Sequence, residues 1–261
     1  VNVYNRSKDK TNALVEKGAK WFDAVGELAA NSKVIITMVG YPSDVEEIYF
    51  GAGKILDRAS NAYFIDMTTS SPSLAARIAQ EAEKRGCHSL DAPVSGGDIG
   101  ARNAKLSIMV GGKQADFDAV LPILKMMGSN IVLQGGPGAG QHTKMCNQIV
   151  VAGTIMGVCE GLAYAKRAGL DANKVMESIG TGAASGFQLL NVGAKMIAGD
   201  FAPGFYVEHF LKDLGIALDE ASKMKLDLPA VALAKRLYDD LVAKGCSRDG
   251  TQVLYTKYIS N

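Results

Sequence analysis

One lysine near the middle of the chain has the surroundings that proton-transfer chemistry requires. Lys144 lies in the segment Gly138–Gln148, which opens with two glycines and leads into a long apolar stretch. If that stretch is a helix, Asn147 and Gln148 lie one turn beyond Lys144 on the same face. A lysine can donate a proton to a carbonyl oxygen and later take it back, and burial favours the neutral amine that this role needs. The alternative is an ordinary solvated lysine, which is the commoner case for this residue type.

A second segment has the residue types that bind a carboxylate. The sequence Asp91–Gly97 ends in Ser95, Gly96 and Gly97, directly after an apolar run that reads as a strand. A serine hydroxyl and glycine N–H groups can surround an anion, because glycine lets the backbone approach the ligand closely. An ordinary turn between a strand and a loop uses the same residues, so the segment by itself leaves both readings open.

The first half of the chain must position both segments. It alternates short apolar runs with helical patterns, which predicts parallel β-α-β units and a doubly wound sheet. The predicted strands are Val34–Val39, Tyr63–Met67, Ser89–Val94, Leu106–Val110 and Asn130–Leu133, and the predicted helices are Lys8–Gly18, Pro72–Gly86 and Ala115–Met127.

The second half lacks strand patterns and predicts helices only. The helices are Gln141–Arg167, Asp171–Ser178, Phe187–Ala198, Phe210–Lys225 and Ala230–Lys244, bounded by Gly, Pro or Asp. The change from alternating strands and helices to helices alone occurs at the glycine-rich segment Gly135–Gly138. We therefore expect an α/β domain over residues 1–136 and an all-helical domain over residues 137–261.

In open α/β sheets, ligands bind beyond the carboxyl ends of the strands. Three of the predicted strands end in polar or glycine-rich segments, at Met38–Pro42, Asp66–Ser71 and Pro93–Gly97. A cofactor is expected along this edge.

The composition of the chain limits the classes of binding partner to be expected. The chain has 261 residues with a net charge of +1, which gives no general attraction to nucleic acid or to an anionic membrane. Its longest uncharged stretch, Met145–Cys159, is shorter than the roughly 20 residues of a spanning helix. The four cysteines form no C-x-x-C pair, and the three histidines lack metal-ligand spacing. We expect reduced thiols, no metal and a cytoplasmic location.

These segments, in this order, resemble the β-hydroxyacid dehydrogenase family, which includes 3-hydroxyisobutyrate dehydrogenase, tartronate semialdehyde reductase and succinic semialdehyde or glyoxylate reductases. The substrate signature is similar to Asp91–Gly97. The catalytic pattern G-x-G-x-x-x-K, followed by Asn147, is similar to the segment around Lys144. A Lys-Asp-Leu of the C-terminal domain matches at Lys212–Leu214, so the resemblance covers essentially the whole chain.

The resemblance implies a dinucleotide-binding domain over residues 1–136 with a Rossmann-type, mostly parallel sheet. It implies that residues 137–261 form an all-α substrate and dimerisation domain with a long interdomain helix. It implies hydride transfer between NAD(P) and a short 3-hydroxyacid or its semialdehyde, with Lys144 as general acid/base. It also implies a homodimer or homotetramer. The substrate contacts it implies are Ser95, Gly96, Gly97, Asn147, Gln148 and Lys212. The cofactor contacts it implies are Met38, Val39, Gly40, Thr69, Lys212 and Asp213.

The chain departs from the family pattern at its front. No G-x-G-x-x-G fingerprint is present, and Val1–Tyr4 corresponds to the family's second strand, so a unit of roughly 30 residues is expected before it. That second strand is followed by Asn5, Arg6 and Ser7 rather than by an acid. An arginine there accommodates the 2′-phosphate of NADP, so NADP is favoured over NAD.

Two other functions are compatible with the resemblance. One is another enzyme of the superfamily, such as an imine reductase or a phosphogluconate-type decarboxylating dehydrogenase. Imine reductases generally replace the lysine, and phosphogluconate enzymes are much longer. The other is a non-catalytic relative that acts as a binding module. The presence of Ser95, Lys144 and Asn147 together favours the dehydrogenase.

Overall fold

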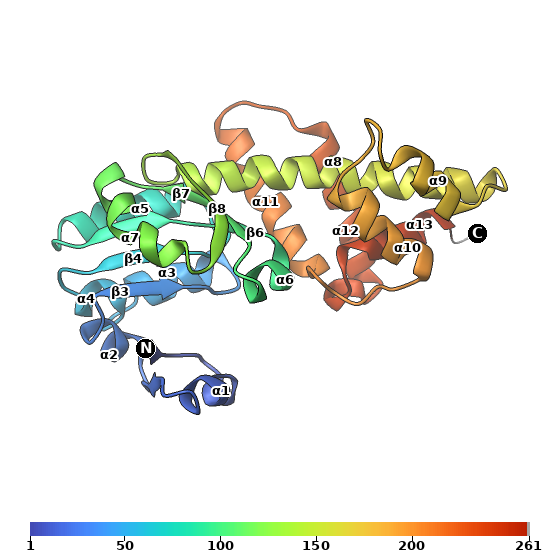
Figure 1. The fold of residues 1–261 in the computed structure, drawn as a ribbon. Helices are drawn as coiled ribbons and strands as arrows, with labels where there is room; N and C mark the ends of the chain where they lie inside the picture. Colours follow the sequence, from blue (N-terminus) through green and yellow to red (C-terminus); the bar gives the residue numbers. More distant parts are fainter. Residues whose placement is uncertain (260–261) are drawn as a thin grey trace. The chain divides into compact units, whose positions relative to one another are not determined.

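The computed structural model describes residues 1–259 and divides the chain into two compact units, Val1–Lys144 and Met145–Asn261. In Figure 1 the first unit runs from blue to green and the second from yellow to red. Helix α8 (Ala139–Arg167) begins in the first unit and continues into the second.

The first unit is built on a six-stranded sheet with the order β3-β4-β5-β7-β6, in which β8 also pairs with β7 along the whole length of that strand. Strands β3, β4 and β5 are parallel, β7 is antiparallel to β5 and β6, and β7 and β8 are parallel. A separate pair of short parallel strands, β1 and β2, completes the described strands. The bounds are β1 Asn2–Val3, β2 Lys20–Trp21, β3 Val34–Thr37, β4 Tyr63–Asp66, β5 His88–Asp91, β6 Val94–Ser95, β7 Leu106–Gly111 and β8 Gly128–Gly135.

Alternation of side chains along β4 explains how helices cover both faces of the sheet. Phe64 and Ile65 are neighbours on β4 and therefore point to opposite faces of the sheet. Phe64 packs in one apolar cluster with residues of α3 (Pro42–Phe50), α4 (Ile55–Arg58) and α5 (Pro72–Glu83). Ile65 packs in a second cluster with residues of α7 (Gln114–Leu124). Both faces are thus covered by helices, as Figure 1 shows, and the predicted doubly wound sheet is confirmed.

The smaller helices of this unit are α2 (Val25–Ala30) and α6 (Gly97–Arg102). The expectation of one helix over Lys8–Gly18 was wrong. The chain instead forms a 3-10 turn, η1 (Lys8–Thr11), followed by the four-residue helix α1 (Asn12–Val15). The Thr11 hydroxyl donates to the carbonyl of Lys8 at 2.6 Å, which favours the tighter turn.

The second unit is helical, as expected, and its described residues contain no strand longer than the single bridge between Tyr206 and Gly250. The predicted helix Phe187–Ala198 begins as a π-helical segment rather than as regular α-helix. After α8 the elements are α9 Ala172–Ile179, the π-helix η2 Gln188–Gly193, α10 Ala194–Ala198, α11 Val207–Lys223, α12 Pro229–Ala243, the 3-10 turns η3 Cys246–Arg248 and η4 Thr251–Tyr255, and α13 Thr256–Ile259.

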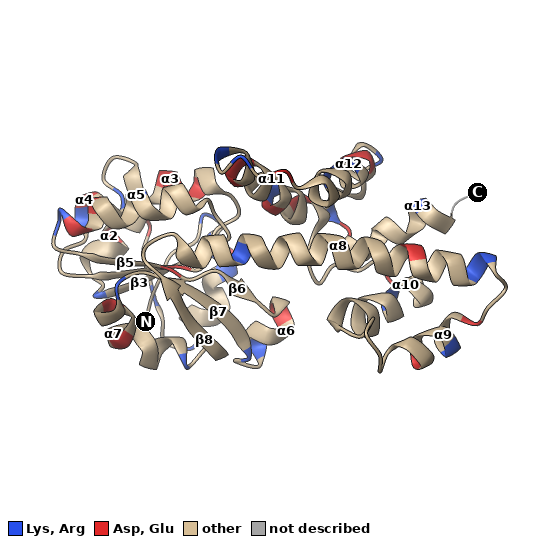
Figure 2. Ribbon diagram, turned by 90° about the horizontal axis from the view of Figure 1, so that it is seen from above, with Lys and Arg blue, Asp and Glu red and all other residues tan. Residues whose placement is uncertain are grey.

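Helix α8 is the core of this unit. Ala152, Ile155 and Cys159, spaced by three and four residues, are fully buried in its main apolar cluster. By length and composition α8 could also cross a membrane. It has no charged residue between Lys144 and Glu160, and its ribbon in Figure 2 is tan over most of its length. Because its apolar stripe packs against α11 and α12 residues, we assign it as the core helix of a globular unit.

Candidate active site

The beginning of α8 is held by a buried carboxylate from the sheet. Asp91, the last residue of β5, accepts the N–H of Gly138 at 2.7 Å and the N–H of Gln141 at 2.8 Å. The first N–H groups of a helix have no partner within the helix, so this carboxylate supplies one from a distant strand. Burial raises the pKa of Asp91, and the backbone hydrogen bonds from Gly138 and Gln141 oppose that rise.

The two glycines of the G-x-G pattern allow this contact. A Cβ at Gly140 would lie 2.3 Å from the carbonyl oxygen of Met109 and 2.8 Å from that of Asp91. Gly138 has a φ of +90°, and a Cβ there would lie 2.8 Å from the carbonyl oxygen of Pro72. The helix therefore approaches the sheet so closely that only glycine fits at these positions.

Gln141 joins the same helix to the segment after β4. It is fully buried, its Oε1 accepts the N–H of Ser70 at 3.0 Å, and its Nε2 donates to the carbonyl of Thr68 at 2.7 Å. The Thr68 hydroxyl in turn accepts the N–H of Val39 at 3.0 Å. The segments that follow β3 and β4 are thus fastened to each other and to α8.

A second buried carboxylate stabilises this edge of the sheet. Asp66 Oδ1 accepts the hydroxyl of Thr37 at 2.8 Å and the N–H of Thr68 at 3.2 Å. Burial raises the pKa of Asp66 to about 6, and the hydrogen bonds from Thr37 and Thr68 limit the rise.

Lys144 follows Gln141 by one helical turn. Its side chain is 7 % exposed, and its Nζ donates to the carbonyl of Val94 at 2.8 Å. Val94 precedes Ser95, so the structure brings the predicted acid/base next to the predicted carboxylate-binding segment. Ser95 lies in β6 opposite Ser107 of β7, whereas Gly96 and Gly97 are exposed and have φ values of +129° and +63° at the start of α6.

The residues predicted to bind the cofactor lie at the carboxyl ends of their strands. Met38 is 65 % exposed after β3 and is followed by Val39 and Gly40. Thr69 is half-buried after β4, between the two residues that Gln141 holds.

The loop after β1 carries the remaining cofactor candidates of this unit. Asn5 Oδ1 accepts the N–H of Ser7 at 2.9 Å. Arg6 is exposed, and its guanidinium lies 3.2 Å from Asp44 Oδ1 at the start of α3. The loop therefore reaches the segment that follows β3.

The second unit assembles the other predicted residues. Gln148 is buried and donates to Asp213 Oδ2 of α11 at 2.6 Å, and the half-buried Asn147 donates to Gln148 Oε1 at 2.7 Å. Lys212 Nζ lies 3.1 Å from Asp213 Oδ1. The Gln148 side chain therefore connects α8 to α11, and Asn147 is the more accessible of the two amides.

Sequence reasoning assigned no role to Gln141, and it named Asp91 only as the first residue of its motif. A glutamine one helical turn before the predicted acid/base lysine could have drawn attention, but its complete burial cannot be seen before the fold is known.

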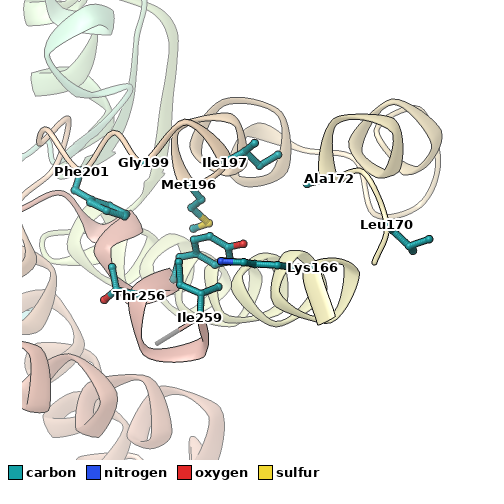
Figure 3. A pocket seen from close by; sticks show the side chains of 10 residues that line it. Lys166, Leu170, Ala172, Met196, Ile197, Gly199, Phe201, Thr256 and Ile259 are labelled. Atoms are coloured by element: carbon teal, nitrogen blue, oxygen red, sulfur yellow. The ribbon is translucent and has the colours of Figure 1, made fainter. Parts of the chain in front are cut away.

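A cavity of about 490 Å³ lies within the second unit. Its lining includes Lys166, Met196, Phe201 and Thr256 (Figure 3), none of them a predicted site residue. Residues 1–259 contain no group of three His, Cys, Asp or Glu side chains that could hold a metal ion.

Two family profiles together match nearly the whole chain. Residues 1–136 match the NAD binding domain of 6-phosphogluconate dehydrogenase, and residues 138–257 match a domain described as NAD-binding of NADP-dependent 3-hydroxyisobutyrate dehydrogenase.

Individual relatives agree with these profiles. The chain is 53% identical over 260 residues to an uncharacterized oxidoreductase of Bacillus subtilis, covering 99% of this chain and 90% of the relative. It is 45% identical to a probable mitochondrial 3-hydroxyisobutyrate dehydrogenase-like protein of Arabidopsis thaliana (97% and 76% covered). It is 39% identical to 2-hydroxy-3-oxopropionate reductase of Escherichia coli (90% and 81% covered).

Solved structures show the same relationship. The 3-hydroxyisobutyrate dehydrogenase of Mycobacterium tuberculosis, solved with L-serine, aligns with a TM-score of 0.88 and 27% identity over 98% of this chain and 89% of that one. An imine reductase of Pseudomonas aligns over 100% of this chain and 91% of its own, with a TM-score of 0.60 and 18% identity, which shows a shared fold only.

Proposed function

Because the chain belongs to the β-hydroxyacid dehydrogenase family, we propose that it interconverts a short 3-hydroxyacid and its semialdehyde by hydride transfer with NADP, and that Lys144 is the general acid/base. The observation that carries this proposal is the buried Lys144 amine, which lies 2.8 Å from the carbonyl oxygen of Val94. Val94 is the residue directly before Ser95. A bound nicotinamide cofactor would supply or accept the hydride.

The residues of the chain account for the proton and for the binding of substrate. Lys144 donates a proton to the carbonyl oxygen during reduction and takes it from the hydroxyl during oxidation. The Val94 carbonyl holds the amine in place between these events. The Ser95 hydroxyl and the exposed backbone of Gly96 and Gly97 bind the substrate carboxylate, which fixes its distance from Lys144. Asn147 orients the substrate from the next turn of α8.

The residues present fit the two ends of a dinucleotide. The exposed guanidinium of Arg6, at the carboxyl end of β1, suits the 2′-phosphate of NADP. Met38, Val39, Gly40 and Thr69 follow the parallel strands β3 and β4, at the edge of the sheet where dinucleotides bind in this fold. Lys212 and Asp213, which form an ion pair on α11, are further cofactor contacts that the family resemblance implies.

The test compares two lysines of the same helix. Lys144→Ala should lower kcat by about 100-fold or more, since general acid/base catalysis contributes about that much. Lys166→Ala, at the far end of α8, should leave kcat unchanged. Substrates are 3-hydroxyisobutyrate, 2-hydroxy-3-oxopropionate and succinic semialdehyde, with a cyclic imine for comparison. Unchanged turnover in Lys144→Ala, or activity on the imine alone, would refute the proposal.

A further inference from the structure

Gln141 makes contacts beyond those of a side chain that only fills space in a core. Both polar atoms of its fully buried amide bond to backbone atoms two residues apart, the carbonyl of Thr68 and the N–H of Ser70. A two-point bond to backbone fixes the position and the orientation of the peptide segment between its ends. That segment contains Thr69, at the carboxyl end of β4.

The backbone of the same residue is tied to a second strand. The N–H of Gln141 donates to Asp91 Oδ2 at the end of β5, so one residue contacts the ends of two adjacent parallel strands. Lys144 follows three residues later on the same face of α8, and its amine is held by Val94. A displacement of the segment 68–70 relative to Gln141 would therefore change its distance from Lys144.

We propose that Gln141 is a positioning residue that sets the distance between the segment 68–70 and the Lys144 amine. The inference rests on the proposed function, in which the cofactor lies along the ends of β3 and β4 and Lys144 handles the proton. Hydride and proton transfer need both partners within a few tenths of an ångström, and a displacement of about 1 Å can cost about 100-fold in rate.

Substitution by glutamate gives a test that depends on pH. A protonated carboxyl has the hydrogen-bonding pattern of the amide, because its O–H can donate to the Thr68 carbonyl and its C=O can accept from Ser70. An ionised carboxylate cannot donate and would repel that carbonyl. Burial, together with the nearby carboxylates Asp91 and Asp66, should raise the pKa of the introduced carboxyl, whereas Lys144 one turn away opposes the rise.

The expected result is a loss that acid reverses. In Gln141→Glu, kcat relative to the unmodified protein should fall about 10- to 100-fold at about pH 8.5 and recover to within a few-fold near about pH 6. In Gln141→Met, which has a similar shape but no hydrogen bonds, the loss should be the same at both pH values. Hydrogen–deuterium exchange of the peptide spanning residues 66–74, measured without cofactor, should be faster in both variants and return to normal in Gln141→Glu at the lower pH.

Gln252 provides the matched control. It is also buried, and its Nε2 donates to the carbonyls of Asp200 and Ala202 at 3.0 Å each, within the second unit. Gln252→Glu and Gln252→Met should change stability without changing kcat per folded molecule. If the Gln141 variants behave in the same way, or if Gln141→Glu shows no recovery in acid, the positioning role is refuted. The exchange measurement distinguishes this from failure of the proposed function, because it requires no turnover.

Discussion

A single added methyl group should destabilise the protein at one position of α8 and stabilise it at another. In Gly140→Ala the new Cβ would lie 2.3 Å from the Met109 carbonyl oxygen and 2.8 Å from the Asp91 carbonyl oxygen. Both are backbone atoms of packed strands, so the start of α8 must move away by about an ångström. Overpacking of this kind costs about 1–3 kcal/mol, and weakening the bond between Gln141 N–H and the Asp91 carboxylate adds about 1–2 kcal/mol. We expect a total loss of about 2–5 kcal/mol.

The comparison position is Gly157, on the exposed face of the same helix. A Cβ there has no atom within 4 Å, so Gly157→Ala adds no clash. Alanine is favoured over glycine inside a helix by about 0.8–1 kcal/mol. The variant should therefore gain roughly that amount of unfolding free energy.

Equilibrium unfolding in urea, followed by far-UV circular dichroism, measures both changes with one assay. Gly140→Ala should also lower kcat, because Lys144 is carried one turn further along the displaced segment, whereas Gly157→Ala should not. An unfolding free energy of Gly140→Ala within about 0.5 kcal/mol of the unmodified protein, the scatter of an ordinary surface change, would contradict the predicted clash. A shift of both variants in the same direction by similar amounts would contradict it too.

Three further predictions concern charged groups. Burial raises the pKa of Asp66 from 3.8 to about 6, so the folded protein binds the proton of the Asp66 carboxyl more tightly than the unfolded chain does. The resulting contribution to stability is present below about pH 4 and is lost as the pH rises through about 6. Asp66→Asn should abolish that decline in urea unfolding compared at about pH 4.5 and about pH 7. Asp91→Asn should lose about 1.5–3 kcal/mol by removing a charge-assisted bond to α8, against less than about 0.5 kcal/mol for the exposed Asp118→Asn. Arg6→Ala should weaken NADPH binding by about 10-fold in a fluorescence titration and leave NADH unaffected, since one charged contact to phosphate is lost; equal weakening for both cofactors would contradict the assignment.

The long periodic elements could be predicted from the sequence to within two or three residues. The predicted helix Gln141–Arg167 is observed as Ala139–Arg167, and the predicted strand Tyr63–Met67 as Tyr63–Asp66. The two-residue strands β2 and β6 could not be predicted, because two residues contain no period. The antiparallel orientation of β7 relative to β5 could not be predicted either, because strand direction depends on pairing between distant segments.

The candidate site also has residues that could be predicted from the sequence and contacts that could not. The chemistry of Ser95 and Lys144 could be predicted without a structure, because the segments around them are similar to the motifs of the family. The hydrogen bonds that hold the surrounding segments in place cannot be read from the sequence. Asp91 reaches Gln141 across 50 positions, and Gln141 reaches Thr68 across 73. No local pattern specifies contacts of that range, so these hydrogen bonds can be recognised only once the fold is known.

The glycines before Lys144 also have a different role from the glycines of a nucleotide-binding loop. In such loops the missing side chain lets a phosphate approach the N-terminus of a helix. Here the space beside Gly138 and Gly140 is filled by backbone of the protein itself, at Pro72 and Met109. The N–H groups at the start of α8 bond to the carboxylate of Asp91, which takes the place that an anionic ligand would occupy. The G-x-G pattern therefore serves to anchor a helix to the sheet, and the position of the Lys144 amine one turn later follows from that anchor.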